Sequence, residues 1–276
     1  MSHFASKCIV GFYKIWHGKL HQRGAGRIIN HLAPRLAGLQ SFPLRLPNGA
    51  VAEVDFRELS ALGWLNTLLG DDHQERPLIA AICNHLHAAS VFWDIGSNAG
   101  IVSYEVSQLA KYREHHYFEP NPKIYPWVEA ALSHLDHATG HKVALSGENG
   151  SATFYVPRKG SAFGSLEGGG DAERDEIQVA KRTCDSLVFE DGLLPPSVVK
   201  IDTEGHEIQV LGGMQRIIDL HRPVIFFEHI EISDEEIRSL VPSGYSLKTV
   251  SNSKGGLTDT FERGAGHNSV LLPDPA

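Results

Sequence analysis

The sequence predicts an α/β fold with a mostly parallel seven-stranded sheet and helices on both of its faces. From Ser90 onward, short apolar runs alternate with stretches of helical periodicity, a pattern typical of βαβ units. Several of these runs end in an acidic or glycine-containing turn. With 276 residues, of which 42% are hydrophobic, the chain is long enough for one such domain and an appended arm.

Two parts precede the alternating region. Residues 1–41 are polar and basic, which predicts an N-terminal helical arm. The main domain is expected to span residues 42–276, and residues 42–89 form its leading part. This part begins as a β-hairpin, with strands at 42–46 and 51–56 around a Pro-Asn-Gly turn. It continues as a helix in which three apolar residues recur every four positions: Leu78, Ile82 and Leu86.

Apolar runs predict the strands of the sheet and the helices between them. The first strand is expected at residues 91–93, and the helix after it carries Val102, Val106 and Leu109 on one face. Further strands are predicted at residues 116–118, 142–145, 198–201, 224–227, 245–250 and 269–272, the last a candidate antiparallel strand. Further helices are predicted from the spacing of Ile124, Val128, Ala131 and Leu135, and of Leu211, Met214 and Ile218.

An insertion separates the predicted strands at 142–145 and 198–201. Residues 152–156 alternate in polarity like an exposed strand, and residues 157–176 are rich in glycine and charge. A loop of this length inside a compact domain is usually functional or disordered. Two interpretations therefore stay open, a lid over a substrate site and a merely mobile loop.

The charge distribution argues against nucleic acid as the main substrate. The net charge is −8, but the first 52 residues carry seven of the 25 basic residues and no acid. The rest of the chain therefore holds 18 basic and 33 acidic residues, whereas phosphate recognition needs a basic face. No run of 18 apolar residues and no signal-peptide pattern occurs, so we expect a soluble, cytoplasmic protein.

A glycine-containing turn at residues 94–100 lies between a predicted strand and a predicted helix. Gly96 allows a sharp bend and the close approach of a ligand to bare backbone. A dinucleotide-binding fold would place Gly-x-Gly-x-x-Gly here, and Asp94 stands where the first of those glycines is expected. A carboxylate repels a phosphate but attracts a ligand with an ammonium and a sulfonium. Asp94 therefore favours S-adenosylmethionine over a nicotinamide or flavin.

Glu119 ends the second predicted strand, 19 residues after Gly100. In nucleotide-binding α/β folds, an acid about 20 residues past the glycine turn binds the ribose hydroxyls of the ligand. The alternative is that Glu119 caps the helix that follows it. Because the turn and the acid occur in the right order and at the right spacing, each strengthens the interpretation of the other.

Ionisable residues also stand at the ends of two later strands. Asp202, Glu204 and His206 follow the predicted strand at 198–201, and Glu228 ends the one after it. Strand ends in open α/β sheets line the ligand crevice. The alternative is that the acids cap the next helix or interact with its dipole. With Glu207, residues 202–207 hold four ionisable groups, more than capping requires, so we expect the side chains at these strand ends in a functional site.

Together these motifs resemble the FkbM family of S-adenosylmethionine-dependent methyltransferases. The resemblance runs from about residue 42 to residue 272 in the family's order. It implies a Rossmann-like class I methyltransferase fold and O-methylation of a hydroxyl on a sugar or a secondary metabolite. The positions that match the family's cofactor residues are Asp94, Gly96, Ser97, Asn98, Gly100, Glu119 and Asn121, and those that match its acidic strand ends are Asp202, Glu204 and Glu228. At position 97 the family more usually has alanine.

The acidic strand ends supply candidates for a catalytic base. An alcohol must lose its proton when it accepts a methyl group, and a base in reach contributes about 10²–10⁴ in rate. Asp202 is the first candidate, followed by Glu228 and His206, whereas Glu204 is assigned to cofactor binding. The same carboxylates could hold a divalent metal, although no spacing demands one. The acceptor is expected to be a small molecule or a carbohydrate. A non-catalytic adenosylmethionine-binding protein and a Rossmann oxidoreductase are the alternatives.

The basic arm admits two interpretations. Apolar residues such as Phe12 and Trp16 lie among lysines and arginines over residues 1–40. A basic helix with such a face can make weak contact with an anionic membrane surface. Alternatively, the apolar residues pack onto the main domain, and the basic face offsets the acidic charge of that domain.

Overall fold

The computed structural model describes residues 41–46, 48–55, 75–157, 164–167, 174–229, 232–251, 255–258, 261 and 267–275. The predicted arm over residues 1–40 and its membrane-surface contact lie outside this set. In the described part of the chain, no helix is both long enough and apolar enough to cross a membrane.

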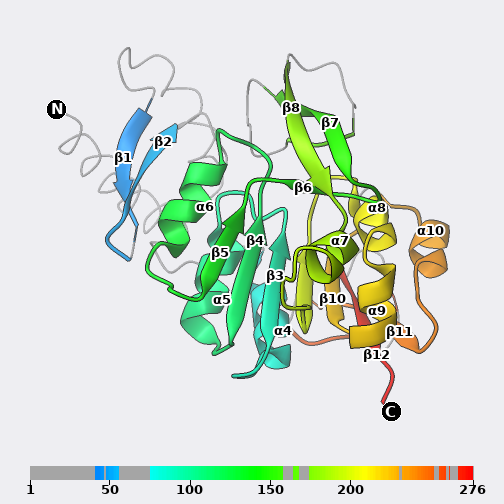
Figure 1. Ribbon diagram of the computed structural model, residues 1–276. Helices are drawn as coiled ribbons and strands as arrows, with labels where there is room; N and C mark the ends of the chain where they lie inside the picture. The colour runs from blue at the N-terminus through cyan, green and yellow to red at the C-terminus, as the bar shows by residue number, and fades with distance from the viewer. Residues whose placement is uncertain are drawn as a thin grey trace, which may run out of the picture.

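The centre of the molecule is a seven-stranded sheet (Figure 1). Its strands in spatial order are β11 (Tyr245–Thr249), β12 (Asn268–Pro273), β10 (Val224–Glu228), β9 (Val198–Ile201), β3 (Val91–Ile95), β4 (Glu114–Phe118) and β5 (Ala138–His141). Neighbours from β10 to β5 pair in parallel, whereas β12 runs antiparallel to both β10 and β11. The predicted mostly parallel sheet and its antiparallel last strand are confirmed.

Alternate residues of the central strands point to opposite faces of the sheet and build two separate apolar layers. Val91, Trp93 and Ile95 belong to one layer, and Phe92 belongs to the other. Strands β9 and β10 alternate in the same way. Both faces of the sheet are therefore apolar, which explains why these strands read as continuous hydrophobic runs.

Helices cover each face. The layer that contains Trp93 includes residues of α7 (Cys184–Phe189), α8 (Glu207–Gly212), α9 (Gln215–His221) and α10 (Asp234–Ser239). The layer that contains Phe92 includes residues of α4 (Arg76–His85) and α5 (Ile101–Leu109), and α6 (Tyr125–Leu132) packs beside α5. The helices on both faces that the sequence predicts are therefore present (Figure 1).

The order of the strands reverses between β3 and β9. From β3 the chain moves outward through β4 to β5, and it later returns to the opposite side of β3 as β9. In open α/β sheets, ligands bind outside the carboxyl ends of the strands at such a reversal. The ends of β3 and β9 are therefore the expected position of a site.

The prediction that residues 142–145 form the third strand of the main sheet is wrong. The strand that pairs with β4 is β5, four residues earlier, whereas Ala144–Leu145 forms β6 in a different sheet. β5 is an edge strand with the polar sequence Ala-Thr-Gly-His and only partial burial. Because an edge strand is held mainly by backbone hydrogen bonds, its side chains carry no hydrophobic pattern that would reveal it.

The insertion forms a second, three-stranded sheet. β7 (Gly150–Pro157) pairs antiparallel with β8 (Arg174–Arg182), and β6 pairs in parallel with β8. Figure 1 shows this hairpin rising above the seven-stranded sheet at the top of the view. The strand predicted at 152–156 is present as part of β7. It is not exposed on both faces as expected, because Phe154 and Val156 are buried in a small apolar cluster.

Three helix predictions also need correction. Leu135, expected on the helix that carries Val128 and Ala131, lies beyond the end of α6 at Leu132. The helix expected to carry Leu211, Met214 and Ile218 is divided into α8 and α9, although all three side chains are buried. At the division, a Cβ on Gly213 would lie 2.1 Å from the carbonyl oxygen of Ser146, so the chain needs glycine for this close approach. Leu109 is 68% exposed and not on the buried face, because it is the last residue of α5.

The predicted N-terminal hairpin is present as β1 (Ser41–Arg45) and β2 (Val51–Asp55), which pair antiparallel. Its turn is anchored by Asn48, whose amide nitrogen donates to the carbonyl oxygens of Ala130 (3.1 Å) and Ala131 (2.9 Å). These carbonyls belong to the last turn of α6, and that of Ala130 also accepts from the hydroxyl of Ser133 (2.9 Å). The hairpin is thereby attached to the outer helix of the domain.

Candidate active site

A pocket opens at the carboxyl ends of β3, β4 and β9, where the strand order reverses. It encloses about 600 Å³, part of it open to solvent, which suits a small-molecule site. Among the residues that line it are seven of the predicted site residues: Gly96, Asn98, Glu119, Asn121, Asp202, Glu204 and His206. The other four do not line it: Asp94, Ser97, Gly100 and Glu228.

The turn after β3 depends on two glycines with positive φ. Gly96 has φ 72°, and a Cβ there would lie 1.8 Å from the carbonyl oxygen of Asp202. Gly100 has φ 83° and is the N-cap of α5, where a Cβ would lie 2.8 Å from Cγ2 of Val128. Gly96 therefore lets the turn approach the end of β9, and Gly100 lets α5 begin beside α6.

Glu119 forms part of the pocket floor and is only 6% exposed. Its carboxylate accepts hydrogen bonds from the backbone amides of Asn98 (2.9 Å) and Asn121 (2.7 Å). Burial raises the pKa of Glu119 to about 7, although these two amides and the charge of Lys200 act in the opposite direction. A carboxylate has about four acceptor positions, so Glu119 keeps capacity for further donors.

The neighbouring polar side chains mainly support the backbone around Glu119. Oδ1 of Asn98 accepts from the backbone amide of Ala99 (2.7 Å), and Oδ1 of Asn121 accepts from that of Lys123 (3.0 Å). Ser97 is buried and donates to the carbonyl oxygen of Phe118 (3.4 Å), so it lies behind the pocket wall. Asn98 and Asn121 therefore both line the pocket and fix its shape.

Asp94 lies beneath the pocket and is fully buried. Its Oδ2 accepts from the hydroxyl of Ser103 (2.6 Å), and its Oδ1 lies 3.2 Å from Nζ of Lys200. Nζ of Lys200 also donates to the carbonyl oxygen of Gly96 (2.8 Å) and lies 3.3 Å from Oδ2 of Asp202. Asp202 is 31% exposed at its side chain, so it reaches the pocket while Asp94 does not.

Glu228, at the end of β10, belongs to a group of acids around Asp202. Burial, followed by the charges of Asp202, Glu204 and Glu207, raises the pKa of Glu228 to about 9. Both effects favour the neutral carboxylic acid over the carboxylate at this position. Glu207 is buried and accepts from the backbone amide (2.7 Å) and the hydroxyl (3.0 Å) of Thr203, which holds the loop after β9.

His206 is the N-cap residue of α8 and is held at both ring nitrogens. Nδ1 lies 2.8 Å from Oε1 of Glu167, and Nε2 lies 3.0 Å from the hydroxyl of Ser146. With both nitrogens engaged, His206 is less suited to accept a proton from a substrate than the partly exposed carboxylate of Asp202. It also links the insertion to the loop after β9 through Glu167.

The insertion contributes an apolar wall that sequence reasoning missed. Phe154 and Leu166 line the pocket, and Gly164 lies against the ring of Phe154. The segment is fixed by Ser165, which exchanges two backbone hydrogen bonds with Tyr155 and donates its hydroxyl to the carbonyl oxygen of Glu204 (2.8 Å). Within the predicted lid region, Gly164 and Leu166 therefore line one side of the pocket.

Sequence reasoning also missed Lys200. A signal was present, because a lysine within an otherwise apolar run is almost never buried without an ionic partner. No comparable signal marks Phe154 or Leu166. These two side chains reach the pocket because the hairpin folds back over the sheet. Local periodicity in the sequence does not reveal that arrangement.

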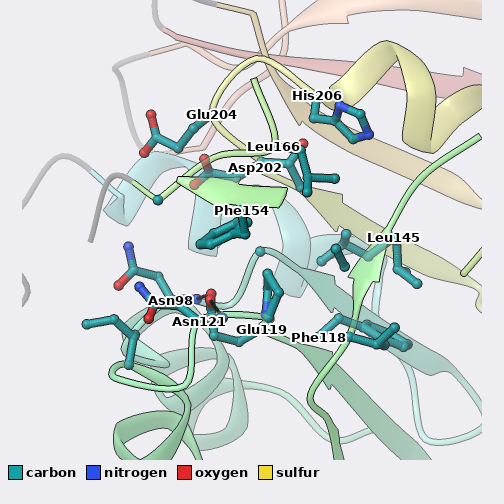
Figure 2. A pocket seen from close by; sticks show the side chains of 18 residues that line it. Asn98, Phe118, Glu119, Asn121, Leu145, Phe154, Leu166, Asp202, Glu204 and His206 are labelled. Atoms are coloured by element: carbon teal, nitrogen blue, oxygen red, sulfur yellow. Dashed lines mark hydrogen bonds between the residues drawn. The ribbon is translucent and has the colours of Figure 1, made fainter. Parts of the chain in front are cut away.

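Figure 2 shows that the pocket has two polar sides. Asp202, Glu204 and His206 lie on one side, Asn98, Glu119 and Asn121 lie on the other, and Phe154 lies between them. On the Glu119 side, a carboxylate held by backbone amides can accept hydrogen bonds from hydroxyl groups. On the Asp202 side, a second carboxylate can take up a proton. Among the described residues, no group of three or more His, Cys, Asp or Glu side chains is arranged to hold a metal ion.

Several known methyltransferases resemble this chain. The chain is 26% identical over 223 residues to the hexuronic acid methyltransferase AglP of Haloferax volcanii, which covers 78% of this chain and 86% of that protein. An FkbM methyltransferase structure from Methylobacillus flagellatus aligns at 14% identity over 94% of this chain and 62% of that chain, with a TM-score of 0.47. A precorrin-6y C5,15-methyltransferase from Geobacter metallireducens aligns at 14% identity over 71% of this chain and 84% of that one, with a TM-score of 0.41.

The methyltransferase FkbM domain matches residues 94–247, which is more than half of the chain. The match begins at the buried aspartate of β3 and includes both polar sides of the pocket. The Rossmann-like fold and the enzyme class that the sequence motifs imply are thereby confirmed. The chain belongs to the FkbM family of methyltransferases.

Proposed function

We propose that this enzyme transfers the methyl group of S-adenosylmethionine to a hydroxyl oxygen of a sugar or a similar small molecule, with Asp202 as the general base. The observation that carries the proposal is that two carboxylates in different surroundings lie on opposite sides of one pocket. A buried carboxylate on backbone amides, at Glu119, faces a partly exposed carboxylate at Asp202 (Figure 2).

The residues on the Glu119 side fit the cofactor. The Gly96 turn leaves bare backbone where a Cβ would collide with the end of β9. Glu119 uses two acceptor positions on backbone amides and keeps others for the hydroxyls of a ribose. Asn98 and Asn121 would bound the same site, and Glu204 would contact the cofactor from the opposite side. When bound, S-adenosylmethionine supplies an activated methyl group on a sulfonium.

The residues on the Asp202 side suit proton removal. Asp202 reaches the pocket, and the ammonium of Lys200 lies 3.3 Å from its Oδ2, so the carboxylate has a positive charge beside it. Glu228 lies outside the pocket lining, and burial raises its pKa, which favours its protonated form, so it is the weaker candidate for the base. His206 would orient the loop, because both of its nitrogens have protein partners. Positioning of the acceptor against Asp202 would supply much of the rate.

A sugar acceptor is supported by the relative named above, a hexuronic acid methyltransferase that covers most of this chain. Sugar hydroxyls need a hydrogen-bond acceptor together with an apolar surface for the ring. Asp202 offers the former, and Phe154 with Leu166 offers the latter. The pocket therefore has the chemistry of a small carbohydrate site.

The test measures methyl transfer from labelled S-adenosylmethionine to a panel of neutral and acidic hexosides. Asp202→Asn should lower kcat by about 10² or more and change the KM for the cofactor only a few-fold. The matched control is Asp136→Asn, an exposed aspartate before β5 at the opposite end of the sheet. Turnover by Asp202→Asn within a few-fold of the wild type would place the base elsewhere. Activity lost on adding a chelator would revive a metal-assisted route.

A further inference from the structure

Lys200 is an unusual residue for its position. It lies in β9, the strand next to the reversal of strand order, and is only 3% exposed. Its neighbours along the strand, Val199 and Ile201, are fully buried in the apolar layer of the opposite face. A buried lysine costs stability unless its charge is compensated, so its partners indicate what it is for.

The partners of Lys200 come from three parts of the site. Nζ donates to the carbonyl oxygen of Gly96 (2.8 Å) in the turn after β3, and it forms ion pairs with Asp94 (3.2 Å) and Asp202 (3.3 Å). An ammonium has three donors and no acceptor. One head group therefore joins the glycine turn to the carboxylate at the end of β9.

The position of the ammonium is itself fixed from behind. The second oxygen of Asp94 accepts from Ser103 (2.6 Å), whose hydroxyl lies 3.0 Å from Nε2 of His115. Burial lowers the pKa of His115 to about 3, so this histidine is neutral and adds no competing positive charge. Asp94 is thereby aimed at Lys200 and at no other cation among the described residues.

We propose that Lys200 is a positioning residue that holds the Gly96 turn and the Asp202 carboxylate in one geometry and supplies a positive charge beside that carboxylate. The inference rests on the proposed function, because Asp202 must be the base. Lys200 does not touch the reacting atoms. Its effect is exerted through Gly96 on cofactor binding and through Asp202 on the protonation of the site.

The charges around Lys200 determine the expected effect of removing it. Burial acts to lower the pKa of Lys200, but the charges of Asp202, Asp94 and Glu75 more than offset it, so the pKa is raised. Without the ammonium, Asp202 would be left among three other acids: Glu204, Glu207 and Glu228. An opposite charge at this range shifts an acid by about 1–3 pH units. The acidic limb of the pH–rate profile should therefore move to higher pH by about 1–3 pH units.

Two variants separate the two connections. Lys200→Gln keeps a donor for the Gly96 carbonyl but removes the charge, whereas Lys200→Met removes both. In both variants the acidic limb of kcat should rise by about 1–3 pH units, and activity should be partly recovered at high pH. The dissociation constant of adenosylhomocysteine should rise about tenfold or more in Lys200→Met and stay within about threefold in Lys200→Gln.

The control is Val199→Ala, a core truncation in the same strand that faces the other layer. It should lower the melting temperature and leave the pH–rate profile unmoved. If both Lys200 variants lose stability but keep the wild-type acidic limb, Lys200 is only a structural ion-pair partner and the inference is overturned. If Lys200→Met does not fold, the acidic limb of the pH–rate profile of Lys200→Gln decides the test. Wild-type protein that fails to bind adenosylhomocysteine would instead refute the proposed function.

Discussion

Replacing Glu228 by glutamine should stabilise the fold at neutral pH and leave methyl transfer nearly unchanged. Burial and the neighbouring acids raise the pKa of Glu228 from 4.5 to about 9. A group whose pKa is raised on folding contributes stability that is fully present below its unfolded pKa and is lost as the pH rises toward its folded pKa. The wild type should therefore lose stability steadily above about pH 4.5.

The magnitude follows from the distance between the unfolded pKa and the working pH. From 4.5 to 7 is about 2.5 pH units, which corresponds to about 3.4 kcal/mol as an upper limit. Because the side chain is only partly buried, we take about 2–3 kcal/mol. Glutamine resembles the protonated acid that is already present at pH 7, so kcat should stay within about threefold of the wild type.

Urea unfolding at pH 5, 6, 7 and 8 and constant ionic strength would measure the effect. The free energies of unfolding of Glu228→Gln and wild type should converge near pH 5 and diverge as the pH rises. The exposed Glu190→Gln provides the same chemical change without burial and should stay within about 0.5 kcal/mol. Parallel stability curves would show that Glu228 is ionised in the fold. A fall in kcat of about 10² at pH 7 would show that Glu228, and not Asp202, takes the proton.

Two further predictions concern the cofactor side. Gly96→Ala should abolish adenosylhomocysteine binding measured by calorimetry, because its Cβ would lie 1.8 Å from the carbonyl oxygen of Asp202. Gly192→Ala is the matched control, with φ +79° but open space around it, and should bind normally. Adenosylhomocysteine affinity should fall as the pH drops from 8 to 6, since protonation of Glu119 near pH 7 removes an acceptor for the ribose hydroxyls. Affinity in Glu119→Gln should be weaker and independent of pH, and a pH dependence that survives this change would exclude Glu119 as its source.

The sequence predicts best those elements that are buried on both sides. Strand β9 was predicted with its observed bounds, because four consecutive residues buried by the two helical layers leave a clear apolar run. Strand β5 was missed because it lies at the sheet edge and is held mainly by backbone pairing to β4. The insertion was misread because its strands pack against one another, and a contact between two segments distant in sequence leaves no local period.

For the site, the sequence predicts which strand ends carry chemistry but not which side of each end reaches the pocket. Asp94 and Lys200 are partners in adjacent strands and both lie beneath the pocket. Asp202, two residues beyond Lys200, reaches the pocket. Motif spacing alone cannot separate a buried acid from an exposed one, because the separation depends on the partners that the neighbouring strands supply.

The hydrogen bond from Lys200 to Gly96 joins residues that are 104 positions apart in the chain. At about 5–20 residues per second on the ribosome, the second side of the pocket is synthesised roughly 5–20 s after the first. During that interval β3 has its neighbour β4 but not β9, so Asp94 is without its lysine and one edge of β3 is unpaired. Closing so long a loop delays the pairing of β3 with β9. The pocket therefore cannot form until β9 has been synthesised, and a nascent chain that ends before β9 holds only half of it.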